Sequence, residues 1–165
     1  VLFRSWQPTF ALNEIDIYVR IGAICQARSI LQWQLTADYS LMKGDGIYET
    51  KGRLQPTQRF YNLKQYGLTP SGSFNIPVYS KGANISHVAY GDIANGIYSV
   101  HIVNNGAERK VTLNGLPIGT KKLEIYTTDS HDRMKSGKTI SVSNGSAVFT
   151  LKSACFTSLL SINKE

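Results

Sequence analysis

The dipeptide Asn-Gly occurs four times in the second half of the chain, and it constrains the fold more than any other feature. It lies at positions 95–96, 105–106, 114–115 and 144–145, each time next to β-prone residues. Asn and Gly both tolerate positive φ, so the pair favours the tight turns that join antiparallel strands. The second half is therefore predicted to consist of short strands separated by turns.

The segments between these turns alternate between apolar and polar residues. In KKLEIYTT (121–128), Leu123, Ile125 and Thr127 fall on one side of a strand and the intervening residues on the other. About six to eight such strands with regularly spaced turns are typical of an antiparallel β-sandwich. The other strands are expected within residues 97–104, 109–115, 138–142, 146–152 and 155–161.

The first part of the chain has a helical period instead. Between Ala11 and Cys25, apolar residues such as Leu12, Ile15 and Val19 recur at spacings of three and four, which predicts a helix. A second apolar stripe, formed by Ile17, Ile21 and Ile24, runs beside the first. A helix that is apolar over so much of its circumference is expected to be buried between layers.

A strand, a loop and a second helix are predicted after this helix. The strand is expected at Ser29–Leu35 and a Gly-rich loop at 42–54. The second helix follows within 55–67, with Pro56 near its first position and Gly67 as its stop. Helix, strand and helix are the repeat of an α/β barrel or of an open α/β sheet, but so few elements cannot cover their own apolar faces.

The predicted fold is therefore mostly β, with an antiparallel β-sandwich preceded by a helix–strand–helix remnant of a (β/α)₈ barrel. Two regions follow from the change of period. Residues 1–69 are expected to be the incomplete C-terminal end of a barrel domain, and residues 70–165 the sandwich. Because a whole barrel needs roughly 250 residues, most of that domain is expected upstream of this sequence.

Composition and charge narrow the class of protein. The 165 residues are 42% hydrophobic and 18% charged, as in a globular protein. The formal net charge is +7, but the basic residues are scattered instead of gathered on one face, as they are in most nucleic-acid-binding proteins. A solvated basic surface is the favoured interpretation, with attraction to acidic polymers as the alternative.

The two cysteines give no metal-site pattern. Cys25 and Cys155 are far apart, and neither belongs to a CxxC motif or a Cys/His cluster, so a zinc site is not indicated. Two buried free thiols are predicted, and a long-range disulfide is the alternative.

The order of these elements resembles the C-terminal end of retaining glycoside hydrolases of the (β/α)₈ clan, most closely family 30. The resemblance rests on a strand ending in QWQLTADYS, the helix QPTQRFYNLKQYG and a sandwich ending in FTLKSACFTSLLS. In these enzymes the last barrel strand, the last barrel helix and a small sandwich follow one another in this order. The resemblance covers about residues 10 to 161.

The resemblance implies a sugar-binding role for residues at the end of the predicted strand. Trp33 would stack on a sugar ring, while Gln34, Asp38 and Tyr39 would bind its hydroxyl groups. A core position is the alternative for Trp33. For Asp38 and Tyr39, turn formation and packing are the favoured interpretation, since Asp is common in turns.

No catalytic residue is predicted within this chain. The resemblance places the two carboxylates of a retaining glycosidase on barrel strands upstream of Ala11. Glu14 and Asp16, in the middle of the first helix, are expected to have surface or helix-dipole roles. His101 alternates with apolar residues, so it is predicted to be a packed histidine.

The hydrolase interpretation also implies partners and a location. We expect a polysaccharide or oligosaccharide ligand, no cofactor, no metal, and no binding to nucleic acid or membrane. The chain is expected to pack against the upstream barrel, in a secreted, periplasmic or cell-surface protein. The alternative is a non-catalytic carbohydrate-binding or structural sandwich module, for which exposed tyrosines are the candidate binding residues, namely Tyr79, Tyr90, Tyr98 and Tyr126.

Overall fold

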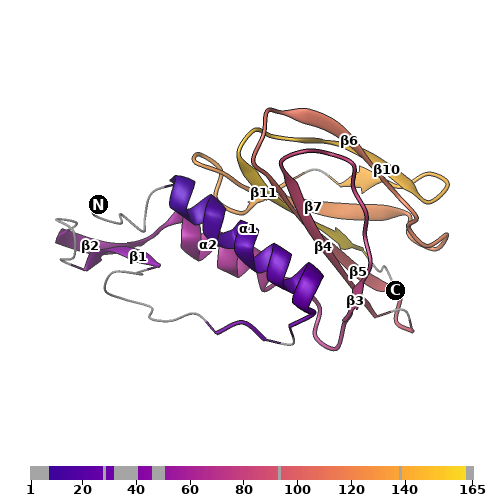
Figure 1. Cartoon of the computed structure of the whole chain (residues 1–165), viewed down its shortest axis with the longest axis horizontal. Coiled ribbons are helices and arrows are strands. Elements are labelled where there is room, and N and C mark those ends of the chain that lie inside the picture. The colour runs from indigo at the N-terminus through magenta and orange to yellow at the C-terminus, as the bar shows by residue number, and fades with distance from the viewer. Residues whose placement is uncertain are drawn as a thin grey trace.

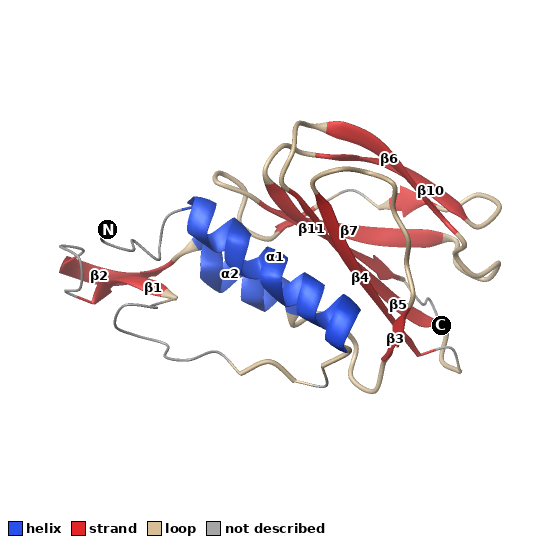
Figure 2. Cartoon of the chain, viewed as in Figure 1, coloured by secondary structure: helices blue, strands red, loops and turns tan. Residues whose placement is uncertain are grey.

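A computed structural model describes residues 8–27, 29–31, 41–45, 51–92, 94–137 and 139–162. The chain begins with helix α1 (Pro8–Cys25), the hairpin β1 (Met42–Asp45) and β2 (Lys51–Pro56), and helix α2 (Gln58–Tyr66). Nine strands follow in the described part of the chain, and Figures 1 and 2 show their arrangement. They are β3 (Phe74–Ile76), β4 (Ile85–Asp92), β5 (Ile97–Asn104), β6 (Arg109–Asn114), β7 (Lys122–Thr128), β8 (Lys135–Ser136), β9 (Ile140–Ser141), β10 (Ser146–Leu151) and β11 (Cys155–Ser161).

The predicted antiparallel sandwich is confirmed. Its larger sheet has the order β3-β4-β5-β11-β7-β8, with β9 also pairing with β7. The C-terminal strand β11 thus lies at the centre, antiparallel to β5 on one side and β7 on the other. Strands β6 and β10 form the second layer as a two-stranded antiparallel sheet. Strand β5 has the bounds predicted from its sequence, whereas β3, β4 and β8 were not foreseen.

An apolar core fills the space between the two layers of the sandwich. Alternate residues of the larger sheet, such as Val100 and Ile102 on β5 and Leu159 on β11, point toward Phe149 and Leu151 on β10. As predicted, Leu123 and Ile125 share this face of β7. The period-two pattern arises because one face of each strand is buried in this core.

The helices cover the opposite face of the larger sheet, so the molecule has three layers (Figure 2). Helix α1 lies against β4 and β5, and α2 lies against β7 and β11. Leu12, Ile15 and Val19 pack on Val88, Val103 and Phe156 of the sheet. Gly22 makes room for a hydroxyl pair, Tyr66–Tyr90 at 2.7 Å, because a Cβ at Gly22 would lie 2.4 Å from the Tyr90 oxygen.

Only two of the four Asn-Gly pairs form hairpin turns. Asn144 and Gly145 both have positive φ, between the paired residues Ser143 and Ser146, and residues 95–96 lie in the β4–β5 hairpin loop. The pairs at 105–106 and 114–115 instead connect strands of different layers, β5 to β6 and β6 to β7. The prediction of turns was right at 95–96 and 144–145 and wrong at the other two pairs, where Asn114 is the last residue of β6 and residues 105–106 lie in an open connection. A dipeptide does not determine whether the next strand stays in the same sheet.

Several predictions for the first part of the chain are corrected. Residues 29–31 form no strand, and the rest of the predicted strand lies outside the described residues. The Gly-rich segment pairs as the hairpin β1–β2. Pro56 ends β2, so α2 begins two residues later, at Gln58, while Gly67 ends it as predicted.

The surroundings of α1 also differ from the prediction. Ile17 and Ile24 are 53% and 73% exposed, so only one of the two apolar stripes is buried. Cys25 is exposed and Cys155 buried, both as free thiols, so the prediction of burial was wrong for Cys25. Neither described helix is long and apolar enough to cross a membrane.

Candidate functional site

The four residues predicted to bind sugar, Trp33, Gln34, Asp38 and Tyr39, lie outside the described residues. The structure describes what adjoins them. On one side Leu31 is 93% exposed, and on the other Leu41 is buried directly before β1. Leu41 and the first turn of α2 form the frame to which this segment is joined.

Thr57 fixes that frame by binding Leu41 twice. Its backbone N–H donates to the Leu41 carbonyl oxygen at 3.0 Å, and its hydroxyl donates to the same oxygen at 2.7 Å. Thr57 is the N-cap residue of α2, but its hydroxyl makes no capping bond within the helix. The hydroxyl therefore closes the β1–β2 hairpin at the start of α2. The hairpin itself projects away from the sandwich (Figure 1).

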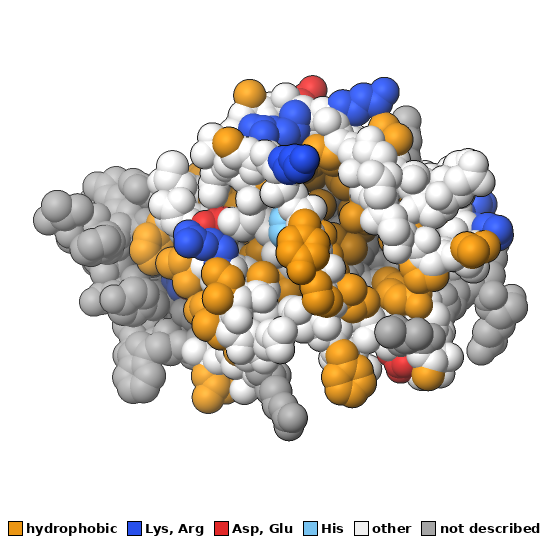
Figure 3. All heavy atoms as spheres, turned by 45° about the vertical axis from the view of Figure 1, so that its right-hand side comes forward, with side chains coloured by type: hydrophobic (Ala, Val, Ile, Leu, Met, Phe, Trp, Pro, Cys, Tyr) orange, Lys and Arg blue, Asp and Glu red, His pale blue; other side chains and the backbone are white. Residues whose placement is uncertain are grey.

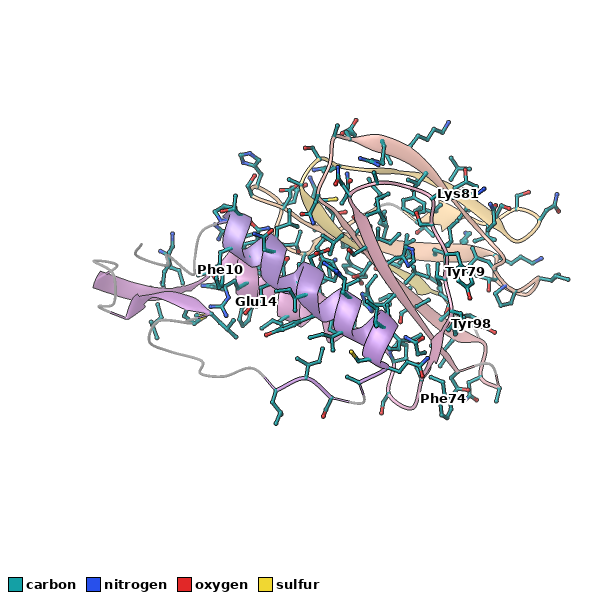
Figure 4. The ribbon with its side chains drawn as sticks, in the orientation of Figure 1. Phe10, Glu14, Phe74, Tyr79, Lys81 and Tyr98 are labelled. Carbon is teal, nitrogen blue, oxygen red and sulfur yellow. The ribbon has the colours of Figure 1, made fainter. Side chains whose placement is uncertain are left out.

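A buried ion pair joins the two helices next to this frame. The Arg59 guanidinium donates to both carboxylate oxygens of Glu14, at 2.7 and 2.6 Å, and its side chain is fully buried. The Arg59 guanidinium also lies 5.3 Å from the centre of the Phe10 ring; Figure 4 labels Phe10 and Glu14 on α1. Glu14 thus has an inter-helix role instead of the surface or dipole role predicted. Asp16 lies 4.0 Å from Arg20 in the same helix.

Glu14 and burial together alter the ionisation of a neighbouring tyrosine. Burial, reinforced by the negative charge of Glu14, raises the pKa of Tyr18 to about 12. The phenol therefore stays neutral near pH 7.

A hollow of about 520 Å³ lies where the two helices begin, lined by Thr9, Gln58, His131 and the Asp129 carboxylate. Asp129 accepts bonds from the backbone N–H groups of His131 and Asp132, both through Oδ1. Lys152 donates to Asp132, which lowers the pKa of that carboxyl group. These carboxylates hold the loop and bind Lys152, so their arrangement is that of a structural cluster. The structure brings together no three potential metal ligands within the described part of the chain.

A third group of polar residues fixes α2 on the sheet. Gln65 is fully buried, and its Nε2 donates to the Phe156 carbonyl oxygen at 3.2 Å and to the Ser158 hydroxyl oxygen at 3.0 Å. Its Oε1 accepts a bond from the Thr128 hydroxyl at 2.7 Å. The amide therefore bridges the central strand β11 and its neighbour β7.

His101 extends the same polar group, and it is packed as predicted. Its ring nitrogens lie 2.9 Å from the Thr69 hydroxyl and 2.8 Å from the Ser158 hydroxyl. The ring is fully buried and stacks on Phe156. Burial lowers the pKa of His101 to about 3, so the imidazole is neutral near pH 7 and has no access to a substrate.

Sequence analysis missed Arg59, Asn62 and Gln65 as structural residues. On a helix of unknown surroundings they form an ordinary polar face, yet they are 0%, 1% and 0% exposed. Their spacing of three was the available signal, because it places them on one side of the helix.

The fold is similar to that of known glycoside hydrolases. No family model and no curated protein matches the sequence. An endoxylanase of family 30 from Clostridium papyrosolvens C71 matches with a TM-score of 0.80 and 18% identity, over 95% of this chain and 39% of that chain. A xylanase of family 30 subfamily 8 from Clostridium acetobutylicum gives 0.81 and 14%, over 95% and 40%. The chain has the fold of the C-terminal region of family 30 glycoside hydrolases.

This chain spans about two fifths of the length of these two hydrolases. A further match is a conserved exported protein from Bacteroides fragilis, with a TM-score of 0.70 and 11% identity, over 93% of this chain and 34% of that one. At these identities the likeness concerns the fold. The resemblance expected from the order of elements is confirmed at that level.

Proposed function

We propose that this chain is the C-terminal portion of a secreted or cell-surface glycoside hydrolase that acts on a polysaccharide. Residues 1–69 would complete a (β/α)₈ barrel, and residues 70–165 would be the accessory sandwich that supports it. The observation that carries the proposal is the match to family 30 xylanases over 95% of the chain, helices and sandwich together. A sandwich module alone would match only the second part.

The exposed side of α1 supports this proposal. Ile17 and Ile24 lie on the side of the helix away from the sandwich, and Leu31 follows them with 93% of its surface exposed. Exposed apolar residues on one side of a helix, here Ile17 and Ile24, suit a surface that another element covers. In the proposed protein, the upstream part of the barrel covers them.

The role of the chain in that protein is to hold one wall of the active site. Active sites of (β/α)₈ barrels lie where the strands end and their loops begin. Trp33 would provide a sugar-stacking surface there, with Gln34, Asp38 and Tyr39 as hydrogen-bonding groups. Thr57 and the Glu14–Arg59 ion pair would hold the chain segment that follows Tyr39 in the sequence. The catalytic carboxylates would come from upstream strands.

The test compares two proteins. The 165-residue chain and a longer product that includes the upstream coding sequence are purified and assayed for reducing sugar released from xylan, β-glucan and galactan. We expect the longer protein to be active and the 165-residue chain to be inactive. In the longer protein, Trp33→Ala should lower kcat/KM at least tenfold, which corresponds to a loss of about 1.4 kcal/mol of transition-state binding. Phe74→Ala, at an exposed aromatic of the sandwich, is the matched control. A longer protein that is inactive on every glycan, or activity of the 165-residue chain alone, would contradict the proposal.

A further inference from the structure

A groove of about 400 Å³ opens on the sandwich between the larger sheet and the β6–β10 layer. Its apolar interior is formed by core side chains, among them Val100, Ile102 and Phe149. The segment Val78–Gly82, which connects β3 to β4, forms its outer wall. A volume of this size is within the range of small-ligand sites.

An aromatic ring lies at the mouth of the groove. Tyr79 is 92% exposed although it belongs to the groove wall. Figure 4 shows Tyr79 and Lys81 on the segment that passes in front of the sheet, with Phe74 at the far end of β3. Of the four tyrosines that were candidates for a stacking surface, Tyr79 alone is exposed, while Tyr90 is bonded to Tyr66. A single exposed ring next to an apolar cavity suits a flat ligand with one apolar face.

The charge of the groove has one sign. Lys81, Arg109 and Lys110 line it, and none of the lining residues is Asp or Glu. The Arg109 guanidinium is oriented by two backbone carbonyls, that of Ala83 at 3.0 Å and that of Ala107 at 3.3 Å. No ion pair of these three residues with a described carboxylate is found. Figure 3 shows this face, with apolar side chains around a hollow and Lys and Arg side chains above it.

We propose that this groove binds an acidic polysaccharide, with a uronate ring stacked on Tyr79 and its carboxylate bound by the basic residues of the rim. The apolar face of the sugar would meet the ring of Tyr79, and Arg109 would bind the carboxylate through its remaining N–H groups. The three positive charges are complementary to such a ligand. The choice of a sugar acid over other anions rests on the proposed function.

The probe is polygalacturonate, and the measurement is its affinity for the 165-residue chain by titration calorimetry at low salt. We expect saturable binding that weakens at high salt, because the rim charges are exposed to solvent. Tyr79→Ala and the double change Lys81→Gln with Lys110→Gln should each weaken binding about tenfold, which corresponds to about 1.4 kcal/mol. Unfolding curves of the same variants check that the fold is retained, since these side chains are exposed.

Matched controls separate the groove from the general positive charge of the chain. Phe74→Ala removes an aromatic that is 79% exposed but lies outside the groove, and Lys121→Gln with Lys122→Gln removes two exposed charges outside it. Neither should change affinity more than twofold. Equal binding of poly-L-glutamate or of neutral xylan, equal losses in the controls, or no binding of polygalacturonate would each overturn the proposal.

The outcomes for the groove and for the hydrolase can be told apart. If polygalacturonate fails to bind while the longer protein releases sugar, the groove proposal alone falls. If it binds in the groove and the longer protein is inactive on all glycans, the hydrolase proposal alone falls.

Discussion

The larger sheet is covered by different chemistry under the β6–β10 layer and under α2. Toward the β6–β10 layer the contact is apolar, with Leu123, Leu151 and Leu159 almost fully buried. Toward α2 it is polar, through Gln65, Thr128 and Ser158. Apolar burial stabilises without directional preference, whereas hydrogen bonds require one position of the helix. The sandwich core therefore requires only apolar residues at alternating positions, while the position of α2 depends on specific hydrogen-bond partners.

Removing the partner of the buried guanidinium tests the polar side most severely. Glu14→Ala leaves Arg59 inside the protein without its carboxylate, and we expect a loss of about 3–5 kcal/mol in the free energy of unfolding. Denaturant titration measures it. Asp16→Ala on the same helix, whose ion-pair partner Arg20 is exposed, is the matched control and should cost less than about 1 kcal/mol. Equal losses of unfolding free energy in the two variants would show that the buried Glu14–Arg59 pair stabilises the fold no more than the Asp16–Arg20 pair does.

Truncating a core leucine tests the apolar side. Leu159→Ala creates a cavity at the centre of the sandwich core, and we expect a loss of about 3 kcal/mol. Val148→Ala, on the exposed face of β10, is the control and should change the unfolding free energy little. If both variants unfold at the same denaturant concentration, the core does not lie between these layers.

Replacing the bridging amide separates shape from hydrogen bonding. Gln65→Leu has a similar volume but removes the hydrogen bonds of the amide to Thr128, Phe156 and Ser158, so we expect a loss of about 2 kcal/mol. Lys64→Leu, at the exposed neighbouring position, controls for helix propensity. A neutral or stabilising effect of Gln65→Leu would mean that α2 needs only apolar contact, and the contrast between the two faces would disappear.

The pH dependence of stability provides a further test of the polar side. The folded state lowers the pKa of His101 from its usual 6.5 to about 3, so the unfolded chain binds a proton first as the pH falls. The contribution of neutral His101 to the free energy of unfolding is fully present above pH 6.5. It is lost as the pH falls from 6.5 to about 3, at up to about 1.4 kcal/mol per pH unit. His101→Gln should flatten the curve between pH 6.5 and pH 4. An unchanged slope in that variant would assign the pH dependence to other groups.

The outer face of α1 should give the smallest effect on stability. Ile17→Ser removes a side chain that is 53% exposed, so we expect a change within about 0.5 kcal/mol. Ile15→Ser, at a buried position of the same helix, is the contrasting variant and should destabilise strongly. A large loss for Ile17→Ser would mean that this face is already covered within the chain.

The same contrast explains how much of the fold was predictable. Strands β6 and β10 follow from alternation and turn residues, which are local properties of the sequence. The role of Gln65 depends on Tyr126, Thr128, Phe156 and Ser158, which lie 61 to 93 residues away, and no local pattern encodes those contacts. The hairpin β1–β2 was missed because its glycines indicate a loop as readily as a tight hairpin.

At the candidate site, only the types of residue could be predicted from the sequence. Trp33, Gln34, Asp38 and Tyr39 stay predictions from resemblance. The contacts of Leu41 with Thr57 and of Glu14 with Arg59 were not predicted either, because each joins residues far apart in the chain.

Co-expression of the chain with the upstream part of the proposed barrel tests the central claim most directly. The reducing sugar released from xylan and β-glucan is measured for the upstream part with and without the chain. We predict activity only when the chain is present, and its loss when Ile17 and Ile24 are both changed to Asp. Full activity of the upstream part without this chain would contradict the claim that it completes the catalytic barrel.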